Sequence, residues 1–178
     1  MEAATKESRP LFTNQQLWAL IVPLLIEQLL AVAVGMADTM MVSQAGEAAV
    51  SGVSLVDMIN NLIIYLFSAL ATGGAVVTSQ FIGARRIREA GDSAGQLVLL
   101  SLLSGLGILA FCLLCGRPVM RLFFGSITED VMEAGLLYLR ITAVSYPFLA
   151  LYNAGAALFR SVGNSGISMR VSIVMNII

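Results

Sequence analysis

Two carboxylates lie inside a segment that is otherwise apolar. Glu27 and Asp38 belong to residues 24–42, which read LLIEQLLAVAVGMADTMMV. A charged side chain at the centre of a membrane costs about 3 kcal/mol on insertion scales, and such groups persist where they face a cavity, a partner or an ion. Both residues are therefore candidates for binding a proton, a metal cation or a cationic ligand.

The spacing of the two carboxylates places them on one face of a helix. Glu27 and Asp38 are eleven residues apart, close to three helical turns. Ala31 and Gly35 lie between them, so the face is small and acidic, which suits a close helix contact or a narrow watery pocket. Pro23, one turn before Glu27, can free backbone carbonyls. An interfacial position stays open for both carboxylates, and for Asp38 we favour a functional role.

A second polar stripe is predicted along residues 52–80. Its members recur at spacings of four, seven, four and seven: Asp57, Asn61, Ser68, Thr72 and Ser79. Asn60 lies beside the stripe. A helix that is polar on one side only must face protein or water rather than lipid. The serines and the threonine are typical of small packing residues, and Asp57 also fits a cap at the helix start.

The elements that carry these residues are predicted to be membrane-spanning helices. Of the 178 residues, 58% are hydrophobic and only 12% are charged, and the mean hydropathy is +0.88. Soluble domains contain about 25% charged residues, and a spanning helix needs about 20 mostly apolar ones. We predict an all-α, polytopic transmembrane bundle. A tail at 1–14 precedes spans near 15–42, 52–80, 94–116 and 134–159, with a truncated fifth at 168–178.

The distribution of Lys and Arg predicts the orientation of the chain. Seven of the ten basic residues fall in the N-terminal tail and in two connections on the same side: Lys6, Arg9, Arg85, Arg86, Arg88, Arg160 and Arg170. The opposite side carries Arg117 and Arg121. Basic residues concentrate in cytoplasmic loops, so we expect a multi-pass plasma membrane protein with a cytoplasmic N-terminus. Arg140, near the outer end of the fourth span, is expected to snorkel or to pair with Glu133.

Charge and composition exclude several classes of function. The net charge is −1 and there is no long basic run, so nucleic acid is not an expected partner. Cys112 and Cys115 form a CxxC pair, but they lie inside an apolar segment, where buried packing is the better interpretation than redox or zinc chemistry. The glycines in ATGGAVV and SGLGIL are interpreted as helix contacts. Pro118 is expected to end the third helix before a short interfacial segment.

Three ordered motifs resemble the multidrug and toxic compound extrusion (MATE) transporters. They are PLLIEQLL followed by GMADTMMVSQAGEAAVSGVSL, then SALATGGAVVTSQFIGAR, then SYPFLALYNAGAALFRSVGNS. The resemblance implies an exporter of twelve spans in two six-helix lobes, of which residues 15–178 are part of the N-terminal lobe. It also implies antiport, in which organic cations or amphipathic drugs leave in exchange for Na⁺ or H⁺. The implied partners are drug-like small molecules, membrane lipids and the second lobe. Neither an enzymatic activity nor a cofactor is implied.

The resemblance also assigns candidate roles to single residues. Asp38 matches the first-span aspartate that is implicated in cation or proton binding, and Asn176 resembles an asparagine that joins that site. With Glu27 they form the expected coupling-ion set, and a metal is expected only as Na⁺ at Asp38. Glu27 departs from the small or apolar residue that is usual at its position, which leaves its role open.

Three further residues are expected to line the substrate cavity. Gln28 fits a glutamine that is common in the family. Asp57 and Asn61 are included because of the polar stripe, although Asp57 matches no functional position of the family.

The sequence is also compatible with alternative functions. A flippase for lipid-linked saccharides, from the same superfamily, usually needs several cationic cavity residues, whereas these spans offer acids and Arg140. An intramembrane enzyme using Glu27 and Asp38 is disfavoured, because a straight helix separates them by about 16 Å, too far for one acid–base pair. A non-transporting fragment becomes the preferred interpretation if the native chain ends at Ile178.

Overall fold

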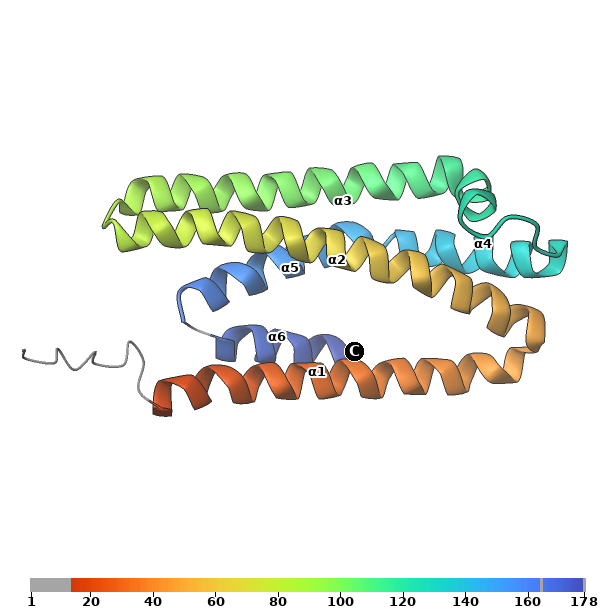
Figure 1. The fold of residues 1–178 in the computed structure, drawn as a ribbon, viewed down its shortest axis with the longest axis horizontal. Helices are drawn as coiled ribbons and strands as arrows, with labels where there is room; N and C mark the ends of the chain where they lie inside the picture. The colour runs from red at the N-terminus through yellow and green to blue at the C-terminus, as the bar shows by residue number, and fades with distance from the viewer. Residues whose placement is uncertain (1–13, 164, 178) are drawn as a thin grey trace, which may run out of the picture.

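The computed structural model describes residues 14–163 and 165–177, and every regular element in this part of the chain is a helix (Figure 1). The elements are α1 (Asn14–Val42), η1 (Ser43–Ala45), α2 (Glu47–Gly83), α3 (Ile87–Phe124), α4 (Glu129–Ala143), α5 (Tyr146–Ser161) and α6 (Ser165–Ile177). The predicted all-α class is therefore confirmed.

The helices form two layers of unequal size. Helices α2, α3, α4 and α5 pack against one another as a bundle, with α4 and α5 following each other along the two long helices (Figure 1). Helix α1 packs mainly against α6 and only slightly against α2. The first helix therefore stands apart from the bundle, and α6 lies between them.

The core of the bundle follows from the helical periodicity of α2. Its buried side chains include Val56, Ile59, Ile63 and Phe67, which recur every three or four residues and so share one face. Buried residues of α3, α4 and α5 complete the same cluster. The interpretation of the CxxC pair as packing is confirmed for Cys112, which is a buried free thiol in this core.

Close backbone contacts hold α4 and α5 in the bundle. A Cβ atom on Gly52 would lie 2.7 Å from the amide nitrogen of Gly135 and 2.9 Å from the carbonyl oxygen of Val131. On α3, a Cβ atom on Gly105 would lie 2.7 Å from the Cα of Pro147. Only glycine permits these approaches, and small residues are the usual means by which helices pack in lipid.

Two irregularities interrupt the long helices. Cys115 has non-helical dihedral angles (φ −114°, ψ 16°), so α3 breaks three residues before Pro118 rather than at the proline itself. The reason is that proline removes one backbone hydrogen bond and its ring clashes with the carbonyl four residues earlier. The segment predicted as one span at 134–159 is divided into α4 and α5, whose axes differ by 49°.

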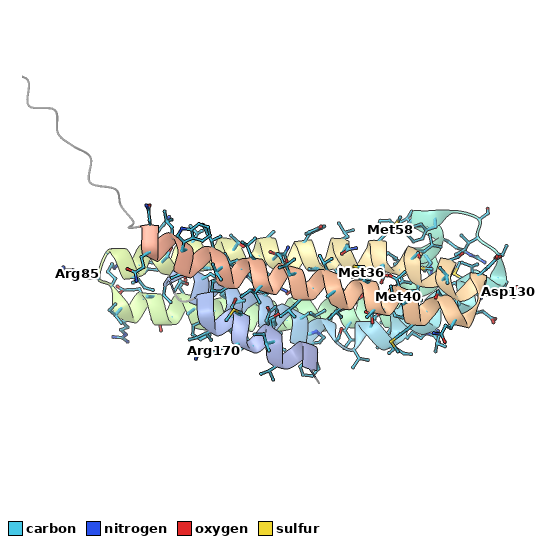
Figure 2. The ribbon with its side chains drawn as sticks, turned by 90° about the horizontal axis from the view of Figure 1, so that it is seen from below. Met36, Met40, Met58, Arg85, Asp130 and Arg170 are labelled. Carbon is cyan, nitrogen blue, oxygen red and sulfur yellow. The ribbon has the colours of Figure 1, made fainter. Side chains whose placement is uncertain are left out.

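The outer surface has the pattern expected of a membrane protein. Helices α1, α2 and α3 are long and apolar enough to cross a membrane, and the bent pair α4–α5 provides a fourth crossing if it counts as one span. Figure 2 places Arg85 at one end of the long axis and Asp130 at the other, whereas the exposed Met36, Met40 and Met58 lie between them. Charged ends and an apolar middle suit a protein that is surrounded by lipid.

Candidate functional site

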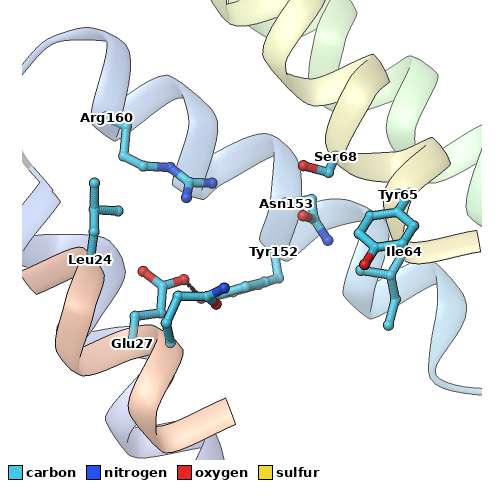
Figure 3. Close-up of a pocket in the computed structure, with 9 residues that line it drawn as sticks. Leu24, Glu27, Ile64, Tyr65, Ser68, Tyr152, Asn153 and Arg160 are labelled. Carbon is cyan, nitrogen blue, oxygen red and sulfur yellow. Dashed lines mark hydrogen bonds between the residues drawn. The ribbon is translucent and has the colours of Figure 1, made fainter. Parts of the chain in front are cut away.

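Glu27 is held at the junction of three helices. The hydroxyl of Tyr152, from α5, donates a hydrogen bond to Oε1 at 2.5 Å (Figure 3). The hydroxyl of Ser168, from α6, donates to Oε2 at 3.0 Å. Both carboxylate oxygens of this partly buried residue thus have a neutral donor. These contacts link α1 to two helices that lie more than a hundred positions later in the chain.

A cavity of about 310 Å³ opens beside Glu27, between α1, α2 and α5 (Figure 3). We call it the Glu27 cavity, and its lining residues are Leu24, Glu27, Gln28, Ile64, Tyr65, Ser68, Tyr152, Asn153 and Arg160. An adjoining cavity of the same size shares several of these residues and reaches Ser172 of α6. Gln28, which the family resemblance assigned to the substrate cavity, lines both spaces.

Arg160 brings a positive charge to the Glu27 cavity. It lies in the last turn of α5, and its Nε donates to the carbonyl oxygen of Ala156 at 3.1 Å. The same side chain lines a third cavity of about 440 Å³, together with Thr72, Ala75, Val76, Ser79, Ala157 and Ser161. The cation in the cavities is therefore Arg160 and not Arg140, which is exposed on α4. The suggested pairing of Arg140 with Glu133 is not among the ion pairs of the described residues.

Asp38 occupies a different environment from Glu27, although the two share α1. Its side chain is exposed in this structure and lines neither the Glu27 cavity nor the adjoining space. The backbone of Asn176 belongs to α6, but its side chain lies outside the part of the chain that the structure describes. The expected pairing of Asp38 with Asn176 therefore stays a prediction.

Asp57 belongs to a hydrogen-bonded group inside the bundle. The hydroxyl of Tyr138 donates to its Oδ1 at 3.2 Å, and Nδ2 of Asn60 reaches the same oxygen at 3.4 Å. The hydroxyl of Tyr146, at the start of α5, donates to Oδ1 of Asn60 at 2.6 Å. We call these four residues the Asp57 cluster. Asn61, the residue expected at the cavity, is exposed, and Asn60 makes the contacts instead.

Several residues at these sites were not predicted from the sequence. Tyr152 and Ser168 hold Glu27, and Arg160 was assigned to a cytoplasmic connection. A usable signal existed for α6, where Ser168 and Ser172 are one turn apart on an otherwise apolar face and are both buried. No comparable signal exists for Tyr152, because an aromatic residue in an apolar span is equally typical of packing. In the residues that the structure describes, no group of three or more His, Cys, Asp or Glu could hold a metal ion.

Comparison with protein families and curated proteins gives consistent relatives. The model of the MatE family matches residues 23–178. The uncharacterized transporter YisQ of Bacillus subtilis (strain 168) is 30% identical over 175 residues, 98% of this chain and 38% of that protein. The probable multidrug resistance protein NorM of Aromatoleum aromaticum (strain DSM 19018 / LMG 30748 / EbN1) is 27% identical over 156 residues, 86% of this chain and 32% of that protein. The chain thus spans about a third of the length of these curated relatives.

Solved structures show the same fold. A MOP superfamily transporter from Pyrococcus furiosus Vc1 (DSM3638) superimposes with a TM-score of 0.82 at 23% identity, over 91% of this chain and 35% of that one. A MATE protein in complex with MaD3S gives a TM-score of 0.81 at 23% identity, over 91% of this chain and 36% of that one. At this level of identity the likeness establishes the fold, whereas function must be argued from the site.

Proposed function

Because this chain belongs to the MatE family, we propose that it forms part of a secondary active exporter. The exporter moves organic cations or other amphipathic compounds out of the cell in exchange for Na⁺ or H⁺. The proposal includes a second lobe, which matches the greater length of the curated relatives. It also places the protein in the plasma membrane, with its N-terminus in the cytoplasm and its apolar faces against lipid.

One observation carries the proposal. Glu27 belongs to an apolar helix and lines a cavity, and its hydrogen-bond partners are neutral hydroxyl groups. A carboxylate in such a place accepts a proton, a metal cation or a cationic ligand, but its single negative charge serves one of them at a time. Competition for that charge links inward movement of the coupling ion to outward movement of the drug. Binding energy that differs between two conformations is what such coupling requires.

Asp38 supplies a second carboxylate to the proposed mechanism. It lies three turns along the same helix, and its side chain is exposed. We propose that Asp38 is the main site of the coupling ion, where the same competition between ion and drug applies, and that Glu27 has an accessory role. Movement of α1 relative to the bundle would then change the surroundings of both groups together, because α1 packs mainly on α6.

The test compares carboxylate variants of the native polypeptide that contains this chain. Asp38→Asn is expected to abolish gradient-dependent export of ethidium, and Glu27→Gln to reduce it. Glu133→Gln is the matched control, because Glu133 is an exposed carboxylate of α4 that lines none of the cavities described above. Cells that retain ethidium equally with and without the protein, and with and without the ion gradient, would contradict the proposal.

A flippase for lipid-linked saccharides is the second candidate function. Several cationic side chains would be needed to hold a pyrophosphate, whereas Arg160 is the one cation that lines the Glu27 cavity and the cavity of about 440 Å³, and no cationic residue lines the adjoining cavity at Ser172. The intact mass of the native polypeptide gives an independent check. A mass more than twice the 18.9 kDa of this chain is expected for a two-lobe exporter, and a mass near 18.9 kDa would exclude export by two lobes of one chain.

A further inference from the structure

An apolar groove lies at the end of the bundle that carries the α2–α3 turn. Its volume is about 570 Å³, and it is lined by the end of α2, the first turns of α3 and the end of α5. We call it the α3–α5 groove, and its lining includes the exposed Ile87 of α3 and Phe159 of α5. It shares no lining residue with the Glu27 cavity, so it is a separate feature of the molecule.

The groove exists because α3 and α5 diverge toward this end of the bundle. Where the two helices touch, a Cβ atom on Gly105 would lie 2.7 Å from the Cα of Pro147. At Gly155, about two turns further along α5, no atom lies within 4 Å of the Cβ position. Figure 1 shows α5 running away from α3 toward the end that carries the α2–α3 turn. The space beside Gly155 is therefore left open by the described residues.

The walls of the groove suit a hydrocarbon chain. Of the described residues that line it, Thr78 is the one with a polar side chain, and its hydroxyl is already engaged. It donates to the carbonyl oxygen of Gly74 at 3.0 Å and pairs with the Ser93 hydroxyl at 3.1 Å. A polar ligand would lose its hydrogen bonds to water there without replacement, whereas an alkyl chain has none to lose. From Ile87 to Val98 the groove follows about 16 Å of α3, close to half of the ~30 Å hydrocarbon core of a bilayer.

The turn at the end of the groove carries positive charge without partners. Arg86 is committed to Glu89, at 2.8 Å. Within the described residues, the exposed side chains of Arg85 and Arg88 form neither an ion pair nor a hydrogen bond. Asp92, one turn after Arg88, is exposed and likewise forms no ion pair, so three arginines stand against two carboxylates. Two guanidinium groups are thus available to an anion.

The backbone and the position of Arg85 also indicate a role for this turn. Arg85 has a φ of 58°, in the left-handed region that favours glycine. A non-glycine residue in this conformation costs free energy, and such residues cluster at functional sites. Ile82 and Ile87, which both line the groove, flank Arg85 in the sequence. Figure 2 places Arg85 at one end of the long axis, where the headgroups of a surrounding bilayer would lie.

We propose that the α3–α5 groove binds an anionic phospholipid of the surrounding bilayer, with one acyl chain in the groove and the phosphate at Arg85 and Arg88. Guanidinium groups form forked hydrogen bonds with phosphate oxygens, and basic pockets between membrane helices bind anionic headgroups. The arginines determine which lipid binds, because the acyl chains are common to anionic and zwitterionic lipids. The inference goes beyond the proposed export function and does not depend on it.

Phosphatidylglycerol and phosphatidylcholine with identical acyl chains test the headgroup contact. Native mass spectrometry of the purified native polypeptide in detergent measures the dissociation constant of the most tightly bound lipid. Phosphatidylglycerol is expected to bind about tenfold more tightly, because each arginine attracts the net negative charge. The double variant Arg85→Gln/Arg88→Gln is expected to remove this preference, and Arg85→Lys/Arg88→Lys to keep it. Arg121→Gln, which removes an exposed arginine at the opposite end of α3, is the control and is expected to change neither affinity.

A second pair of variants tests the groove itself. Gly155→Leu places a side chain at a Cβ position that has no neighbour within 4 Å, so the protein is expected to fold with the groove filled and to bind both lipids more weakly. Gly95→Leu is the control, because Gly95 of α3 is equally free of neighbours and does not line the groove. Thermal unfolding of both variants verifies that they are folded.

Three outcomes would overturn the inference. The first is equal affinity of the parent protein for the two lipids. The second is an undiminished preference for phosphatidylglycerol in Arg85→Gln/Arg88→Gln. The third is equal lipid binding by Gly155→Leu and Gly95→Leu, which would show that another segment of the native polypeptide, rather than a lipid, covers the groove.

Discussion

The Asp57 cluster and the Glu27 cavity use similar side chains for different purposes. Each has one carboxylate that accepts from a tyrosine hydroxyl. In the Asp57 cluster, the polar groups satisfy one another inside a tightly packed bundle. At Glu27, the helices are far enough apart to leave about 310 Å³ open. The difference shows that helix separation, rather than residue type, decides whether such a carboxylate is enclosed by polar partners or lies beside an open cavity.

Helix separation is itself set by small residues. Glycines allow α2 and α4 to touch at Gly52 and Gly135, which closes the region around the Asp57 cluster. At Gly35 of α1, no atom lies within 4 Å of a Cβ placed on the glycine, so this position makes no comparable contact, and α1 packs only slightly against α2. The Glu27 cavity therefore lies beside a helix, α1, that has no such close contact at its glycine.

The largest effect on stability is expected from a substitution that separates α2 and α4 near the Asp57 cluster. Gly52→Leu inserts a side chain where a Cβ already lies 2.7 Å from a backbone nitrogen, so α2 and α4 must separate. The expected loss is about 3 kcal/mol of unfolding free energy, as for severe overpacking. Thermal unfolding in detergent measures it. Gly107→Leu is the control, since nothing lies within 4 Å of its Cβ position.

An intermediate effect is expected at the Asp57 cluster. Tyr146 is 1% exposed and donates to Asn60 at 2.6 Å, so Tyr146→Phe leaves a polar acceptor without its donor. Hydrogen bonds between membrane helices contribute about 0.6 kcal/mol on average, and we expect about 1 kcal/mol for this buried one. The same unfolding experiment detects it. A stability equal to that of the parent protein would show that this cluster is not structural.

At the Glu27 cavity, the corresponding change should affect transport more than stability. Tyr152→Phe removes the donor at 2.5 Å from Oε1, but the cavity beside Glu27 gives water or a ligand access to the freed oxygen. We expect a loss of less than about 0.5 kcal/mol in unfolding free energy and a clear decrease in dye export. Tyr65→Phe is the matched control, because Tyr65 lines the same cavity and is not among the hydrogen-bond partners of Glu27 in the described residues. A stability loss as large as that of Tyr146→Phe would remove the contrast between the two regions.

The smallest effect is expected on the α6 side of Glu27. Ser168→Ala removes the weaker donor, at 3.0 Å from Oε2, and leaves the bond from Tyr152 in place. Export should fall less than in Tyr152→Phe, with almost no change in stability. Ser104→Ala provides the comparison, because the Ser104 hydroxyl donates within α3 to the Ser101 carbonyl. A larger effect in Ser168→Ala than in Tyr152→Phe would show that α6, rather than α5, positions the carboxylate.

Local sequence patterns predicted the helices correctly and marked the carboxylates inside an apolar helix as candidate site residues. Long uncharged segments predict helices because a backbone in lipid must satisfy its own hydrogen bonds. The presence of Glu27 within such a segment was enough to mark it as a candidate. Pro118 indicated that α3 would be interrupted, although the break is at Cys115, because the clash acts on the preceding turn.

The polar stripe of α2 shows where sequence reasoning fails. Spacing alone grouped Asp57 with Asn61, yet Asn60 receives the hydroxyl of Tyr146 and Asn61 is exposed. The two asparagines are neighbours in sequence and about 100° apart around the helix, since a turn contains about 3.6 residues. Which of them faces the bundle depends on where α4 and α5 lie, and a single helix carries no information about that.

The sequence by itself determined that this chain forms apolar helices, where their charged residues fall, and to which family it belongs. These features depend on local composition and on ordered motifs. Only the tertiary structure decided that Tyr152 and Ser168 hold Glu27, that Arg160 shares its cavity, and that Asp57 is enclosed. The physical reason is that these contacts join residues from different helices, so they exist only after the packing of small residues has set the distances between helix axes.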